Sequence, residues 1–410
     1  MNVYAGPARA ITRVTLRLVP LTPVHIGDGT EWRPDEYAIE EPRAAGRRYD
    51  EAGEEIEESG PTGPAMLCRF DQQAAMRGMT AVQRTKFTRA LDRGDLMSAA
   101  QALREAGRGY VLDRIPLSSN SARALKEAMD NPLRGGAVKP FLRSGGVPCI
   151  PGSSIKGAFR TALASAVLPR DREPPFGWRH ETALAAAFGL DPGDTTSDPL
   201  RFLSVSDSPL PEGATLIDKT EVVKAGGASA AGSQRGGIQM HYERTRCLCE
   251  AGEAPGFLVS LAVDERAARP GQLRRAEAQF DLPRLLRLAR DFHVKLFNTE
   301  NQRFFDGETK SLLLGRLRAH LGPGKEPPFM QQVWTPGFLL LRLGRFGHFE
   351  SKSLEGVRRG HFPQARHPAD KIRPPNDWGS TRTVVRDARR NPIPFGWVIG
   401  WVVKEERLPC

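Results

Sequence analysis

The sequence predicts an α+β fold, and two features of the residue pattern indicate it. Segments in which apolar and polar residues alternate, as in half-buried strands, are separated by segments whose apolar residues recur every three or four positions, as in helices. This alternation occurs in two successive halves, each closed by strands, and a chain of 410 residues exceeds what one hydrophobic core usually serves. We therefore expect tandem α+β domains at residues 1–265 and 266–410.

The first half opens with a strand at residues 11–19, which runs through a proline-containing turn into the loop at residues 24–29. Residues 40–64 are polar and acidic, and we expect an exposed hairpin or loop insertion there. Helical patterns follow, and Ser118 or Ser119 is placed to cap the last of them. These helices are predicted at residues 71–77, 82–108 and 118–130.

The best-defined element is a helix whose apolar stripe runs from Ile155 to Val167 with helical spacing, directly after a short strand at residues 147–150. The glycine, serine and alanine tract at residues 225–237 buries too little surface to order alone, although a ligand can order it. Strands are predicted around this tract at residues 202–205, 214–223, 239–249 and 257–263.

The second half begins with a helix-rich stretch at residues 282–321, whose arginines lie largely off its apolar face. We interpret those cations as a solvated surface. Strands return afterwards and end in an apolar strand. They are predicted at residues 337–343, 381–385 and 396–403.

The composition indicates an acidic partner, and a soluble protein with an excess of surface arginine is the alternative that charge alone leaves open. Lys plus Arg number 59 against 48 Asp plus Glu, a formal net charge of +11, and nucleic acid is the commonest partner of such a chain. No apolar run is long enough to cross a bilayer and no signal peptide is recognisable, so we expect a cytoplasmic protein without a membrane partner.

The five cysteines are scattered and odd in number, which argues against a disulfide framework. Cys247 and Cys249 have no second pair of ligands nearby, so we predict no metal site and interpret both as buried strand residues. No phosphate-loop, zinc-protease or paired CxxC motif occurs, and we expect no cofactor.

The first candidate site is the strand-to-helix turn at residues 150–160. Glycine and two serines precede a helix whose first turn carries Lys156, and Arg160 follows one turn later. The serines are predicted to cap the helix, and its free amides and positive dipole end suit a phosphate. A capped turn with solvated cations is the alternative. The Ser153 to Lys156 spacing also matches an S-x-x-K nucleophile, but no K-T-G motif or export signal accompanies it.

Two further glycine loops are candidates. His25 and Asp28 in the first loop suit general acid–base work on a ribose hydroxyl, and a tight turn with a packed histidine is the favoured alternative. At residues 341–352 a strand ends in Gly344 and Gly347, which flank an arginine and an aromatic residue. Close backbone approach beside a cation and a stacking face is typical of single-stranded RNA binding, and a glycine hairpin without ligand is the alternative.

Three of these segments together resemble the RAMP superfamily of CRISPR-associated proteins: residues 21–27, 150–160 and 344–347. Within it, residues 202–207, the loop at 343–352 and the Pro394 to Trp397 ending are most similar to the family of fifth subunits of type III-A Csm complexes. The resemblance implies tandem RRM-like, ferredoxin-like domains with helical and loop insertions. The tract at residues 225–237 has no counterpart that we can place.

The resemblance also implies a function. It indicates a non-catalytic subunit that binds crRNA, caps its 3′ end, and supports crRNA maturation and antiviral defence. The implied partners are crRNA, an adjacent RAMP backbone subunit, the small helical subunit and recruited nucleases. The residues expected to contact RNA are His25, Gly27, Gly152, Ser153, Ser154, Lys156, Gly157, Arg160, Gly344, Arg345, Gly347 and Lys352.

Two alternatives stay open. One is a metal-independent crRNA-processing endoribonuclease of the RAMP type with His25 as general base. The other is a different RAMP position in the same complex, either a backbone subunit or the subunit that binds the 5′ tag. Asp28 lies in the region where target-cleaving backbone subunits carry an aspartate, but its position does not identify it as that residue.

Overall fold

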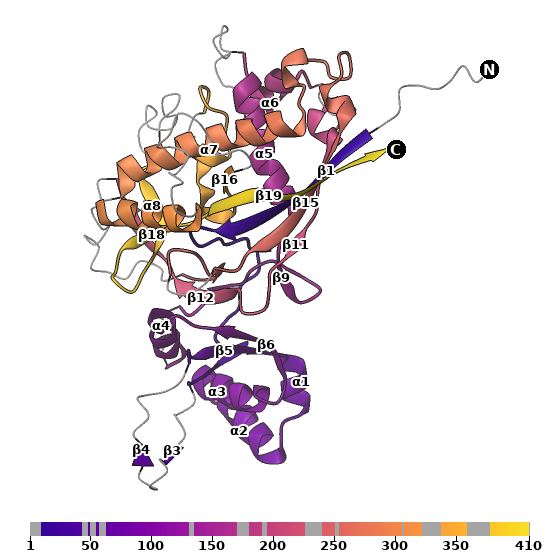
Figure 1. The fold of residues 1–410 in the computed structure, drawn as a ribbon. Coiled ribbons are helices and arrows are strands. Elements are labelled where there is room, and N and C mark those ends of the chain that lie inside the picture. The colour runs from indigo at the N-terminus through magenta and orange to yellow at the C-terminus, as the bar shows by residue number, and fades with distance from the viewer. Residues whose placement is uncertain are drawn as a thin grey trace, which may run out of the picture.

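The computed structural model describes most of the chain. The described residues are 10–42, 48–49, 55–56, 63–130, 135–169, 180–190, 195–225, 240–250, 254–305, 307–321, 338–358 and 378–409. The predicted glycine tract, apart from residue 225, and most of the predicted loop insertion at residues 40–64 lie outside these ranges. Within them the structure mixes helices and sheets, as the sequence predicts (Figure 1).

The main sheet has five antiparallel strands in the order β10-β15-β1-β19-β16. The first strand lies at its centre because every second side chain of its second half is buried and both of its edges are paired. The five strands are β1 (Ala10–Pro20), β10 (Leu203–Val205), β15 (Phe257–Asp264), β16 (Phe338–Arg342) and β19 (Trp397–Pro409).

Two long helices pack on each other and on the edges of this sheet: α5 (Gly152–Val167) contacts β10, and α7 (Leu282–Phe304) contacts β16. The apolar stripe predicted from Ile155 to Val167 is buried in the largest core cluster of the molecule. Two shorter helices flank them in Figure 1, α6 (His180–Phe188) and α8 (Gly307–Leu321).

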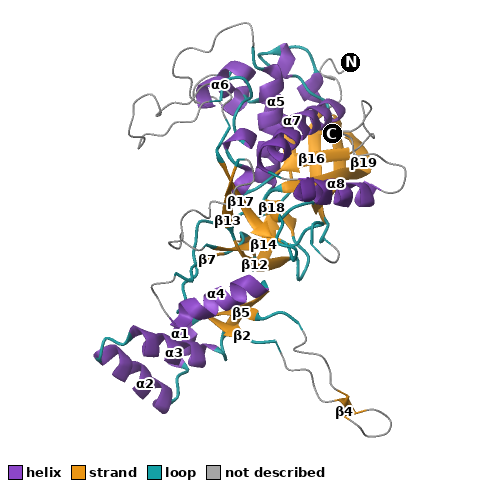
Figure 2. Ribbon diagram, turned by 90° about the vertical axis from the view of Figure 1, so that its left-hand side faces the viewer, coloured by secondary structure: helices purple, strands orange, loops and turns teal. Residues whose placement is uncertain are grey.

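A separate smaller unit lies at the far end of the molecule from both termini (Figures 1 and 2). It combines a three-stranded sheet with helices around two small cores, one of which also includes Val138 and Ile217 from outside the unit. Its elements are β2 (Tyr37–Glu40), β5 (Met66–Phe70), α1 (Gln72–Arg77), α2 (Ala81–Asp92), α3 (Leu96–Gly107), β6 (Val111–Pro116) and α4 (Ser119–Asp130).

Short strands connect this unit to the main sheet. They form three small sheets, β11-β9-β8, β12-β14-β7 and β13-β17-β18, while two further strands pair in an isolated hairpin. Their bounds are β3 (Arg48–Tyr49), β4 (Glu55–Ile56), β7 (Val138–Lys139), β8 (Arg143–Ser144), β9 (Val147–Ile150), β11 (Ser208–Pro209), β12 (Thr215–Lys219), β13 (Glu221–Lys224), β14 (His241–Thr245), β17 (Thr381–Arg386) and β18 (Pro392–Pro394).

Several predicted elements need correction. The helix expected at residues 82–108 is two helices. Gly94 adopts φ +69°, and the Asp95 side chain then caps α3 by accepting the Ser98 amide. The strand expected at 214–223 is divided into β12 and β13, whereas the helix-rich stretch expected at 282–321 is present as α7 and α8. Cys247 and Cys249 are buried as predicted, but they follow β14 instead of lying in it.

Other expectations agree with the structure. Ser118 caps α4 by accepting the Ser121 amide at 3.2 Å, and the four described cysteines are free thiols. The division near residue 265 and the tandem RRM-like description stay predictions, since strands from both sides of that position share the main sheet. In the described ranges no helix has the length and hydropathy to cross a membrane.

Candidate nucleic-acid interface

The three loop segments singled out in the sequence meet at one groove. A cavity of about 520 Å³ opens between the loop after β1, the first two turns of α5 and the loop after β16. We call it the glycine-loop groove. Its lining residues are Ile26, Gly27, Ser153, Ser154, Gly157, Ala158, Arg160, Thr161, Arg342, Leu343, Gly344, Arg345, Ser351 and Lys352.

Backbone contacts hold the two loops against each other. The Arg345 amide donates to the His25 carbonyl oxygen at 2.9 Å, and the Leu343 amide donates to the Gly396 carbonyl at 2.8 Å. Gly344 adopts φ +85° and ψ −170°, a conformation essentially limited to glycine. The main chain at Gly344 is therefore fixed at the groove without a side chain to obstruct it.

The His25 side chain belongs to the core and not to the groove. It is 2% exposed, its Nδ1–H donates to the Glu243 carbonyl at 2.7 Å, and its ring packs edge-on against Tyr242. The pKa of His25 is lowered to about 4. Burial is the main cause and the nearby Arg345 contributes, while the hydrogen bond to Glu243 acts in the opposite direction. His25 is therefore a packed core histidine in the folded chain, the alternative favoured from the sequence.

A buried ionic cluster supports the second loop from below. Arg342 is 6% exposed, and its guanidinium donates to Glu300 at 2.5 Å and to the Phe346 carbonyl at 3.2 Å. Glu300 also accepts from Arg382 at 2.6 Å and from the Trp397 indole at 2.8 Å. Burial alone raises the pKa of Glu300, but the two guanidinium groups outweigh it and hold the pKa below its ordinary value. The cluster fixes one wall of the groove.

The cations at the groove mouth give it its charge. Arg345 and Lys352 are exposed, and neither has an acidic partner within the described part of the chain. The Lys352 ammonium donates to the Arg345 carbonyl at 3.2 Å. Although the side chain reaches solvent, partial loss of water around the ammonium and the neighbouring Arg342 and Arg345 lower its pKa. Arg160 is half-buried and pairs with Asp198. Crowded cations without counter-charges favour an anionic ligand.

The start of α5 differs from the predicted phosphate cradle. Helix α5 begins at Gly152 with Pro151 as its N-cap, and Pro151 has no side-chain group that could cap it, so neither serine has the predicted capping role. The Gly152 amide instead donates to Asp207 at 2.7 Å, and the Lys156 ammonium donates to the Leu203 carbonyl at 2.8 Å. Both groups are thus engaged by the chain itself, away from the groove.

Eight of the twelve predicted contact residues line the groove, and His25, Gly152, Lys156 and Gly347 do not. Gly347 is buried beneath the loop, where its carbonyl accepts from Ser351 Oγ at 2.7 Å. Three polar lining residues, Thr161, Arg342 and Ser351, were not among the predicted contacts. Of these, only Arg342 could have been predicted from the sequence. An arginine at the end of the apolar run of β16 is buried, and a buried arginine needs an acidic partner.

The loop also stores backbone strain. His348 has φ +56° and ψ 173°, a conformation that side chains rarely adopt, and its Nε2 is buried without a hydrogen-bond partner. Burial, Arg342 and Arg382 lower the pKa of His348 to about 2, so its ring is neutral at physiological pH. Strain of this kind collects at functional sites.

Comparison with known proteins places this fold. The RAMP superfamily model matches residues 129–313, a range that contains α5 and α7, and the resemblance predicted from the sequence is thereby confirmed. Two solved structures share the fold of the chain. One is a chain of the Csm-crRNA-target RNA ternary complex, with a TM-score of 0.55 and 18% identity, covering 95% of this chain and 100% of that one.

The second is T. onnurineus Csm5, with a TM-score of 0.51 and 16% identity, covering 93% of this chain and 99% of that one. At these low identities the similarity concerns the fold alone. It agrees with the prediction of a Csm5-like RAMP protein. No curated protein matches the sequence.

Proposed function

We propose that this protein is a non-catalytic crRNA-binding subunit of a type III-A CRISPR effector complex. The observation that carries the proposal is the glycine-loop groove. It joins segments more than 300 residues apart into one cationic cavity of about 520 Å³, bordered by main chain that a ligand can approach closely. The likeness to a chain of a Csm-crRNA-target RNA complex supports the same assignment.

The groove suits the backbone of single-stranded RNA. Arg345 and Lys352 offer a guanidinium and an ammonium group to phosphates, and Arg160 adds a third cation whose charge Asp198 partly neutralises. Gly27, Gly157 and Gly344 present no side chain that keeps the strand away. Among the residues that the structure describes, no carboxylate lines this cavity. Contacts of this kind are largely independent of base sequence and sensitive to salt.

The position in the complex is part of the proposal. We infer that the subunit caps the 3′ end of crRNA, beside a RAMP backbone subunit and the small helical subunit, and supports crRNA maturation by recruited nucleases. The likeness to T. onnurineus Csm5 supports this position. A complex reconstituted without this chain then leaves the 3′ end of the guide open to an exonuclease, and protection unchanged by the omission contradicts the 3′ position.

RNA binding by the purified chain tests the groove. Arg345→Ala with Lys352→Ala removes two exposed cations, and we expect affinity for oligouridine RNA to fall about tenfold. The slope of log affinity against log salt should become less steep by about 0.7 for each lost phosphate contact. Lys156→Ala is the matched control, because its ammonium is bonded to the Leu203 carbonyl. Unchanged affinity and slope in the double variant reject the groove.

The rival is the RAMP-type endoribonuclease with His25 as general base. The ring of His25 is 2% exposed and bonded to Glu243, which gives it no access to a ribose hydroxyl in this conformation. Incubating the protein with repeat RNA in EDTA, beside His25→Ala, separates the two functions. Cleavage that is lost in His25→Ala supports the nuclease, and an intact RNA in both reactions supports the binding subunit.

A further inference from the structure

A second cationic surface lies on the hairpin of β17 and β18. The hairpin tip, residues 386–391, carries three arginines at positions 386, 389 and 390. Asp387 closes the turn, since its carboxylate accepts from the Asn391 amide at 2.7 Å and from the Asn391 side chain at 3.1 Å. The acid of the tip is therefore engaged within the turn, while Arg389 and Arg390 are exposed.

One of these arginines occupies a position better suited to glycine or asparagine. Arg390 has φ +66°, and only His348 shares a positive φ among the other non-glycine residues that are described. Its amide donates to the Asp387 carbonyl at 2.9 Å, so it follows the closing turn of a tight hairpin, where glycine is preferred. A strained arginine at such a position indicates that its side chain has a use there.

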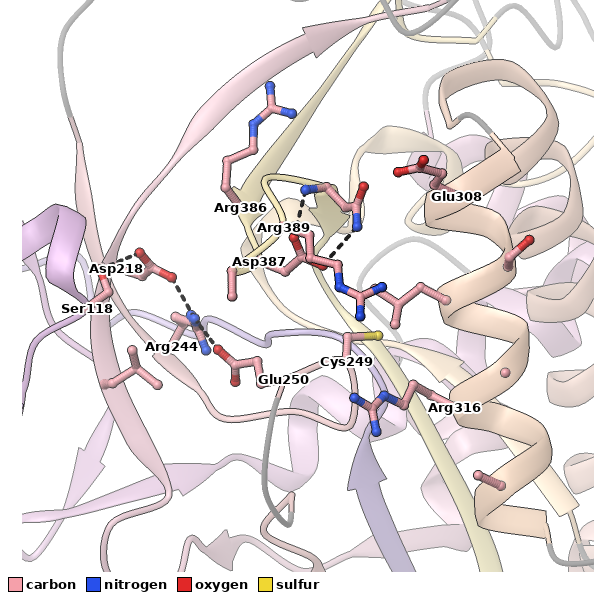
Figure 3. Close-up of a pocket in the computed structure, with 17 residues that line it drawn as sticks. Ser118, Asp218, Arg244, Cys249, Glu250, Glu308, Arg316, Arg386, Asp387 and Arg389 are labelled. Atoms are coloured by element: carbon pink, nitrogen blue, oxygen red, sulfur yellow. Dashed lines mark hydrogen bonds and ion pairs between the residues drawn. The ribbon is translucent and has the colours of Figure 1, made fainter.

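The hairpin tip separates two large cavities, of about 1030 Å³ and about 960 Å³. Both are lined by Arg386, Asp387 and Ala388, so they lie on two sides of the tip. The first lies between the tip and α8, and Arg389 and Arg316 project into it from these two walls (Figure 3). Leu312 of α8 and Leu216 of β12 also line this cavity, so part of its wall is apolar.

The second cavity adds cations from other elements. Arg123 of α4 and Lys219 of β12 line it together with Arg390. Five cations of the two cavities thus have no acidic partner within the described ranges: Arg123, Lys219, Arg316, Arg389 and Arg390.

Most acids of these cavities are already engaged. Asp218 and Glu250 both accept from Arg244 at 2.6 Å, and Glu221 accepts from Arg386 at 3.0 Å. Two further carboxylates line the walls, Glu127 and Glu308, and Glu127 is itself engaged in another interaction. Cations outnumber the available acids, so the surface suits an anionic ligand.

The chain connects this surface directly to the glycine-loop groove. Strand β18 runs into Phe395 and Gly396, whose backbone accepts the Leu343 amide at 2.8 Å. The rings of Phe395 and Phe346 lie 4.8 Å apart. A strand of RNA held at the glycine loop is thus bound next to the base of the same hairpin that carries the arginines.

We propose that the hairpin tip is a second contact surface for single-stranded RNA. Phosphates bind the guanidinium groups of Arg389, Arg390 and Arg316, and a base lies against the apolar wall of the first cavity. Cations distributed on both sides of a projecting hairpin, beside an apolar wall, fit a nucleotide chain better than an acidic peptide. The inference rests on the proposed function, because the same RNA occupies the groove and the tip.

Arg390→Gly is the decisive variant. Glycine adopts φ +66° without strain, so the melting temperature should stay the same or rise, whereas the affinity for oligouridine RNA of about 30 nucleotides should fall about fivefold. Adding Arg389→Ala should deepen the loss. Arg287→Ala on α7 is the control, because this arginine is exposed and lines neither cavity. Unchanged RNA affinity in the tip variants overturns the inference.

A parallel measurement on Arg345→Ala with Lys352→Ala separates the two proposals. Weaker binding in both sets supports both sites, and weaker binding only in the groove variant overturns the hairpin tip but leaves the groove standing. Weaker binding only in the tip variants supports the tip and rejects the groove. A poly-glutamate peptide is the remaining probe: if only its binding depends on Arg389 and Arg390, the tip is a site for an acidic protein partner and the inference fails.

Discussion

Gly344 lies directly against the backbone of His25. A β-carbon at position 344 would be 2.4 Å from the His25 carbonyl oxygen, closer than non-bonded atoms approach. The same oxygen accepts the Arg345 amide at 2.9 Å. Residues 25 and 344 are 319 positions apart in the chain. Their two loops are therefore joined at a point where only glycine fits.

Gly344→Ala should destabilise the protein and open the groove. The substitution combines a glycine-only backbone conformation with a steric overlap, and we expect a loss of about 3 kcal/mol in the free energy of unfolding. Gly356→Ala is the matched control. Gly356 also has a positive φ, but nothing lies within 4 Å of its β-carbon position, so its loss should be about 1 kcal/mol. If urea unfolding gave the same loss of free energy of unfolding for both variants, the close contact between position 344 and His25 would not contribute to the destabilisation.

Gly157→Ala should have opposite effects on stability and binding. Gly157 lies inside α5 with open space around its β-carbon position, so alanine should stabilise the helix by about 0.5 to 1 kcal/mol. The added methyl group lines the groove, however, and should hold the RNA backbone further from the helix. Thermal unfolding and RNA titration together check this. An affinity that rises with stability would mean that RNA does not approach α5.

The stability of the protein should fall as the pH decreases below neutrality. The pKa of His25 is lowered from 6.5 to about 4 by burial, so between these values the unfolded chain binds more protons than the folded one. Protonation of the unfolded state then removes stability as the pH falls, by about 2 kcal/mol for His25 alone between pH 7 and pH 5.

Urea unfolding at these two pH values measures the effect. His25→Asn keeps an N–H near the Glu243 carbonyl but cannot titrate, and it should reduce the difference in stability between the two conditions. His241, whose pKa burial also lowers to about 4, should give a similar reduction as His241→Asn. A stability difference that His25→Asn leaves unchanged would contradict the pKa assigned to His25.

Local patterns predicted the elements well where periodicity was strong. The stripe from Ile155 to Val167 and the alternation at residues 11–19 became α5 and β1 almost unchanged. The strands β2, β5 and β6 were missed because short strands in a small unit depend on pairing with distant partners. The break between α2 and α3 depended on a single glycine with positive φ, which periodicity does not detect.

The sequence predicted most of the residues that line the candidate site, but not the direction in which each side chain points. Gly27, Arg345 and Lys352 line one groove, as their loop and glycine context indicated. Lys156 was expected beside them, but its ammonium faces the Leu203 carbonyl on β10. The side of a helix that faces a ligand is decided by the neighbouring sheet, and spacing along one helix does not contain that information.

The sequence by itself determined that this is an α+β chain with an excess of positive charge and three glycine-bearing loops, because backbone propensity and charge are local properties of residues. Only the tertiary structure decided that those loops share a groove, that His25 is buried and that Glu300 supports Arg342 beneath Gly344. Such relationships arise when β1, β16 and β19 pair across the whole chain, and long-range strand pairing sets which side chains meet.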